Sequence, residues 1–124
     1  MSKVKKILAV VDNSEYVYEG LRQNFEYSIP GLELVWYGGG KQILQALGEG
    51  KRFDLILMDG KLQGGFTGPL YTKEIIENYP ESLVIGYSTG NLAKVFLENG
   101  AKYFVSKGMP LQEFAGFIKK VLGI

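Results

Sequence analysis

Four short apolar runs of this chain end in polar residues whose types could do chemistry together. These residues are Asp12 with Asn13, Asp59, Ser88 and Lys107. A carboxylate can act as a nucleophile, oxygen ligands can hold a divalent metal, and a lysine with a hydroxyl can hold a phosphoryl group. The combination favours phosphoryl transfer if the fold brings the four positions together. Taken singly, each residue also has a simpler explanation as a turn residue, a cap or a solvated charge.

The apolar runs themselves predict the elements that must position these residues. Leu55–Met58 is short, uninterrupted and followed by Asp59 and a glycine, which is typical of a strand buried on both faces of a parallel sheet. The other runs that predict strands are Ile7–Val11, Leu32–Trp36, Leu83–Ile85 and Tyr103–Val105.

Each predicted strand is followed by a segment with helical spacing or length. Strands that alternate with helices predict an α/β fold, a doubly wound five-stranded parallel sheet with five helices. Because the carboxyl ends of parallel strands point the same way, the polar residues should converge at one edge of the sheet, where such folds bind ligands.

Two predicted helices are well marked and one is short. Ser14 is a good N-cap for a first helix that would bury Val17, Leu21 and Phe25. The helix from about Leu92 to Glu98 is short because Asn99-Gly100 ends it. The last helix has the clearest apolar stripe, formed by Leu111, Phe114, Ala115, Ile118, Val121 and Leu122.

Length and composition limit the possible functions. The chain has 124 residues, 46% of them hydrophobic, so we expect one domain spanning residues 1–124. It has no cysteine and no histidine, which excludes disulfides, thiolate or imidazole metal sites and histidine-based triads. The net charge of +1 predicts neither nucleic-acid nor membrane binding. The early run Ile7–Val11 is too short for a signal peptide, so we expect a soluble, cytoplasmic protein.

One motif suggests a different class of protein. Residues 86–90, Gly-Tyr-Ser-Thr-Gly, match the G-x-S-x-G nucleophile elbow of α/β-hydrolases. That mechanism needs a histidine after the serine, and this chain has none. A small hydrolase that uses Ser88 is therefore kept only as a contrast.

These residues together resemble the receiver domains of two-component response regulators, of the single-domain, chemotaxis-regulator-like kind. The resemblance covers essentially the whole chain, in four segments of the right order: ILAVVDN, LILMDG, VIGYST and GAKYFVSKG. It implies the receiver fold, a flavodoxin-like arrangement, in agreement with the pattern of strands and helices.

The resemblance also implies a function that is not enzymatic in the usual sense. Asp59 would accept a phosphoryl group from a histidine kinase or phosphotransfer protein, with Lys107 and Ser88 holding the product. Ser88 and Phe104 would form the switch that changes the face read by a downstream protein. Magnesium would be held by Asp12, Asn13, Asp59 and the backbone carbonyl of Lys61.

The chain departs from the family pattern at several positions. Asn13 stands where the family has a second acid, so metal binding should be weaker. The loop before Gly68 is longer, the helix after Ser88 is short, and Gly108 replaces a proline. The alternative hypothesis is therefore a pseudo-receiver, a protein-binding module of the same fold that is not phosphorylated.

Overall fold

A computed structural model describes residues 5–124; the predicted domain's first four residues lie outside the described residues. It contains alternating strands and helices, as predicted. The strands are β1 (Lys6–Val11), β2 (Leu32–Tyr37), β3 (Leu55–Met58), β4 (Val84–Ser88) and β5 (Tyr103–Ser106). The helices are α1 (Glu15–Ser28), α2 (Gly40–Gly48), α3 (Gly68–Asn78), α4 (Ala93–Glu98) and α5 (Leu111–Leu122).

The strands form one sheet in the order β2-β1-β3-β4-β5, and all four pairings are parallel. The central strand β3 is buried along its whole length, from Leu55 to Met58. It is covered by helices on both sides, which confirms the predicted doubly wound α/β fold.

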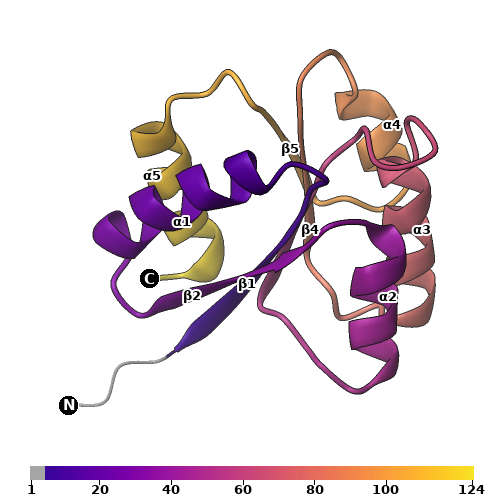
Figure 1. Ribbon diagram of the computed structural model, residues 1–124, viewed down its shortest axis with the longest axis horizontal. Coiled ribbons are helices and arrows are strands. Elements are labelled where there is room, and N and C mark those ends of the chain that lie inside the picture. The colour runs from indigo at the N-terminus through magenta and orange to yellow at the C-terminus, as the bar shows by residue number, and fades with distance from the viewer. Residues whose placement is uncertain (1–4) are drawn as a thin grey trace.

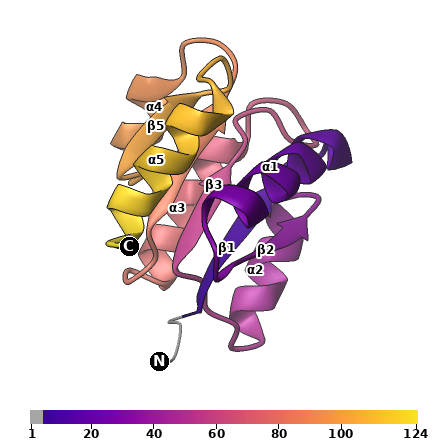
Figure 2. The same cartoon turned by 90° about the vertical axis from the view of Figure 1, so that its left-hand side faces the viewer.

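The helices form two layers, one on each face of the sheet (Figures 1 and 2). Helices α1 and α5 pack on one face, where Phe25 meets the edge of the Phe114 ring at 5.4 Å between centroids. Helices α2, α3 and α4 pack on the other, around Ile43, Ile75 and Phe96. Successive strand residues alternate between these two cores, as the pleat of a strand requires.

The predicted helix ends agree with the structure. The Ser14 hydroxyl caps α1 by accepting from the Val17 amide at 3.4 Å. Leu21 and Phe25 are buried, and Val17 is half-buried beside them. Helix α4 is short, as expected.

The strands are slightly longer than their apolar runs. β1 begins at Lys6, β2 continues through Tyr37, β4 runs from Val84 to Ser88, and β5 continues through Ser106. The reason is that ladder pairing follows the backbone, so it continues past the last apolar side chain. This extension places Ser88 inside β4 and not in the turn after it.

Candidate functional site

Lys107 joins two buried carboxylates at the carboxyl edge of the sheet. Its ammonium Nζ lies 2.8 Å from Oδ2 of Asp12 and 3.3 Å from Oδ1 of Asp59. Asp12 is 1% exposed and Asp59 6% exposed. Buried charges are costly unless they are paired, so one lysine that serves two acids stabilises the cluster while leaving one excess negative charge.

The parallel sheet holds these residues in place through their backbones. The Asp12 amide donates to Tyr37 O at 3.1 Å, and the Asp59 amide donates to Val11 O at 2.9 Å. The Lys107 amide donates to Ser88 O at 3.0 Å. The convergence that the sequence predicts therefore arises from ladder hydrogen bonds that continue one residue beyond the strands.

Burial raises the pKa of the Asp59 carboxyl above its ordinary value, and the neighbouring charge of Asp12 raises it further. The charge and hydrogen bond of Lys107 and the backbone amide of Lys61 act in the opposite direction. Asp59 is therefore a carboxylate whose charge is poorly solvated. A poorly solvated anion gains from any cation or bond that takes up its charge.

Ser88 lies against the turn that follows Asp59. A methyl group added to Gly60 would come within 2.8 Å of Ser88 Oγ. The Ser88 hydroxyl is buried and donates to Thr89 O at 3.1 Å.

Phe104, the other predicted switch residue, lies on the neighbouring strand β5. It pairs in register with Gly86 of β4, and its half-buried ring tilts against Phe96 of α4 at 5.8 Å between centroids.

Asn13 and Lys61, two of the predicted metal ligands, are exposed beside this cluster. The described residues contain no group of three or more acidic, cysteine or histidine side chains that could hold a metal. Mg²⁺ in proteins is often bound by one or two carboxylates together with waters and phosphate oxygens. The predicted ligand set therefore fits magnesium: it offers two carboxylates, the amide oxygen of Asn13 and the backbone carbonyl of Lys61. It carries one negative charge fewer than a site with three acids.

Comparison with known sequences identifies the family. The sequence model of the response regulator receiver domain matches residues 8–119. This chain belongs to the receiver domain family. Receiver domains are signalling modules of two-component systems, and they generally bind Mg²⁺ at their acidic pocket. No curated protein sequence matches the chain significantly.

Solved structures agree with the receiver fold. A CheY-like receiver domain protein from Methanospirillum hungatei JF-1 has a TM-score of 0.84 at 20% identity, covering 97% of this chain and 95% of that one. A response regulator from Thermotoga maritima has a TM-score of 0.84 at 19% identity, covering 98% of this chain and 100% of that one. At this level of identity, the similarity concerns the fold.

Two aromatic residues of the receiver site escaped sequence reasoning. The Trp36 indole donates to the Asp12 backbone carbonyl at 2.7 Å. The Tyr87 ring lies under the Lys107 ammonium, 5.8 Å from Nζ to its centroid, and burial raises the pKa of the Tyr87 hydroxyl. Trp36 ends the apolar run of β2, the one strand whose end contributes no polar residue to the predicted site, so its position was the available signal.

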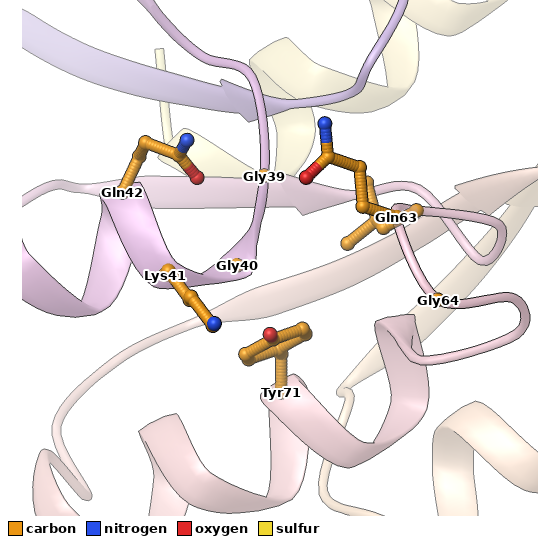
Figure 3. A pocket seen from close by; sticks show the side chains of 8 residues that line it. Gly39, Gly40, Lys41, Gln42, Gln63, Gly64 and Tyr71 are labelled. Carbon is orange, nitrogen blue, oxygen red and sulfur yellow. The ribbon is translucent and has the colours of Figure 1, made fainter.

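A separate hollow of about 290 Å³ opens between α2, α3 and the loop after β3 (Figure 3). Tyr71 lies directly beneath Gly40, where any side chain would collide with its ring. None of the predicted site residues lines this hollow.

Among residues 5–124, no helix is both long enough and apolar enough to cross a membrane.

Proposed function

We propose that this receiver domain accepts a phosphoryl group on Asp59 from a phosphohistidine of a histidine kinase or phosphotransfer protein in the cytoplasm. The observation that carries the proposal is the buried Asp59 carboxylate, held by Lys107 beside Asp12. A carboxylate oxygen would form a bond to phosphorus while the bond from phosphorus to the donor's imidazole nitrogen breaks, and the released imidazole would take up a proton.

Each residue of the site has a distinct part in this proposal. Lys107 is already within 3.3 Å of Asp59 and would hold the transferred oxygens by its charge. Asp12, Asn13, Asp59 and the Lys61 carbonyl would hold magnesium, which when bound offsets the negative charge of the phosphoryl oxygens. The Ser88 hydroxyl can exchange its bond to Thr89 O for one to the phosphoryl group.

The signal would leave through the packing around Gly86. Ser88 lies two residues beyond Gly86 in β4, and the rings of Phe96 and Phe104 are in contact with each other. A side chain on Gly86 would lie within 2.6 Å of the Phe96 ring, so β4 and α4 are closely packed here. A shift of Ser88 would therefore be passed to Phe104 and the face formed by α4 and β5, which a downstream protein would read.

The test is a titration of magnesium and beryllofluoride, a mimic of the acyl phosphate, followed by amide NMR shifts. We expect saturable shifts that spread from Asp59 to Ser88, Phe104 and Lys107. The Asp59→Asn variant should show none of them, because asparagine offers no anionic oxygen to the beryllium. If the wild-type protein does not respond at millimolar magnesium, phosphorylation is refuted and the pseudo-receiver alternative replaces it.

A groove beside the site supports a proposal for how the donor docks. Three adjoining hollows follow α1 and form this groove, and two of them also reach Leu111 at the start of α5. The first is lined by Tyr16, Gly20, Tyr87 and Lys107 among others. Tyr16 of the first hollow and Tyr27 of the second are 91% and 90% exposed. Because this groove leads to Lys107, we propose that a helix bearing the phosphohistidine docks in it.

Gly20→Ala tests this docking. A methyl group at Gly20 would meet nothing within 4 Å, so it should fill only the open groove and strengthen helix α1 by ~0.5–1 kcal/mol. We expect phosphoryl transfer from a phosphohistidine protein to slow about tenfold, since a methyl group pressed against the docked helix should cost at least part of the roughly 1–3 kcal/mol that overpacking costs in a core. Rates with a small donor such as acetyl phosphate should not change.

Gly116→Ala on α5 is the matched control, because a methyl group there also meets nothing within 4 Å and Gly116 lies outside these three hollows. Equal transfer rates for Gly20→Ala and the wild-type protein would refute the proposed route. Slower transfer with both kinds of donor would instead indicate damage to the site itself.

A further inference from the structure

Trp36 is the single tryptophan of the chain, and it lies beside the candidate site. Its indole Nε1 donates to the Asp12 backbone carbonyl at 2.7 Å, a short and well-formed hydrogen bond. The side chain is nevertheless 37% exposed. Burial alone therefore does not account for so large an aromatic residue at the end of the edge strand β2.

The orientation of the Trp36 ring is held from a second element. The ring stacks on Tyr18 of α1, with centroids 6.1 Å apart and planes 23° apart. The Tyr18 hydroxyl in turn donates to Leu34 O of β2 at 3.2 Å. The indole N–H is thus aimed at the Asp12 carbonyl by the place of Trp36 in β2 and by the Tyr18 ring of α1.

The carbonyl that accepts this hydrogen bond is that of Asp12, which lies in the peptide plane between Asp12 and Asn13. A peptide unit is planar, so a hydrogen bond that fixes its oxygen also limits rotation about the two bonds that join the unit to its flanking Cα atoms. These Cα atoms carry the two side chains that would present oxygens to magnesium from this turn. A single indole bond therefore limits the directions in which both side chains leave the backbone.

The other hydrogen bonds of this turn are made by Asp12 and Ser14, and in the part of the chain that the structure describes none of them involves Asn13. The aspartate amide donates to Tyr37 O, and the carboxylate accepts from the Ser14 amide at 2.8 Å through Oδ1 and pairs with Lys107 through Oδ2. The Asn13 side chain is exposed, and it has no charge with which to attract a cation. A neutral ligand depends more on being correctly placed beforehand, because it contributes less attraction of its own.

We infer that Trp36 is a positioning residue for the cation site, whose indole holds the Asp12–Asn13 peptide so that both side chains would be available to a bound magnesium ion. This inference rests on the proposed function. It assigns to the end of β2 a part in a site otherwise built from the ends of β1, β3, β4 and β5. Removal of the indole N–H should weaken magnesium and beryllofluoride binding without unfolding the protein.

Trp36→Phe tests the inference, since it removes the donor and keeps an aromatic ring for Tyr18. We expect the dissociation constants for magnesium alone and for magnesium with beryllofluoride, from amide NMR shifts, to rise roughly fivefold. In the wild-type protein without metal, the indole proton of Trp36 should exchange slowly with water, which reports the hydrogen bond independently of binding.

Asn78→Ala on α3 is the matched control, because it also removes one side-chain hydrogen bond to a backbone carbonyl, that of Glu74, but leaves the indole bond and its Tyr18 contact in place. It should bind magnesium as the wild-type protein does, with a urea midpoint close to that of Trp36→Phe. Wild-type affinity in Trp36→Phe, or equal weakening in both variants, would overturn the inference and leave the proposed function intact. If the wild-type protein itself does not bind, both are overturned.

Discussion

Replacing Gly68 by alanine is expected to destabilise the fold by roughly 3 kcal/mol, at the upper end of what overpacking costs. Gly68 begins helix α3, and its amide donates to Gly60 O at 3.1 Å. A methyl group here would collide with the Asp59 carbonyl oxygen and come within 2.9 Å of the Gly60 Cα. These are backbone atoms of Asp59, the proposed phospho-acceptor, and of Gly60, so no side chain can turn away to make room.

Urea unfolding of Gly68→Ala measures this cost. Gly116→Ala is again the control, because its methyl group meets open space and should stabilise α5 by about 0.5–1 kcal/mol. A loss below 1 kcal/mol for Gly68→Ala would mean that α3 can move away from Asp59. In that case the loop between β3 and α3 would not be fixed by its contact with the site.

Replacing Asp59 by asparagine is expected to stabilise the metal-free protein at neutral pH while abolishing phosphoryl transfer. Burial and the charge of Asp12 raise the pKa of Asp59 in the folded state above its ordinary value of 3.8. The folded protein then binds more protons than the unfolded chain between these two pKa values, so stability falls as pH rises through that interval. Asparagine carries no charge, so it avoids this loss, and its amide oxygen can still accept from Lys107.

The measurement is the urea midpoint of both proteins between pH 3.5 and pH 7.5 in EDTA, with Glu77→Gln as an exposed control on α3. The gain in Asp59→Asn should exceed the roughly 0.5 kcal/mol typical of surface changes at pH 7. It should shrink as the pH falls towards 3.8, because the folded and unfolded states are protonated alike only below the ordinary pKa. A stability difference between the two proteins that stays constant with pH would show that the charge of Asp59 does not destabilise the folded state.

The amino-acid sequence by itself determined the α/β fold and the place of the site. Five apolar runs separated by helical segments admit few arrangements other than a parallel sheet with helices on both faces. Once the strands are parallel, their carboxyl ends share one edge, so the positions of Asp12, Asp59, Ser88 and Lys107 follow from local sequence. The N-cap Ser14 and the short α4 were predictable for the same reason, since caps and breakers act over a few residues.

Only the tertiary structure decided which of these groups touch. Lys107 pairs with Asp12 more closely than with Asp59, although the resemblance assigns it to the phosphoryl group on Asp59. Trp36 reaches Asp12 across 24 residues of sequence, and Lys107 reaches it across 95. Such contacts depend on strand order, register and side-chain rotamers, which no local pattern encodes. The shared lysine, the raised pKa of Asp59 and the indole on the Asp12 carbonyl are therefore properties of the folded chain alone.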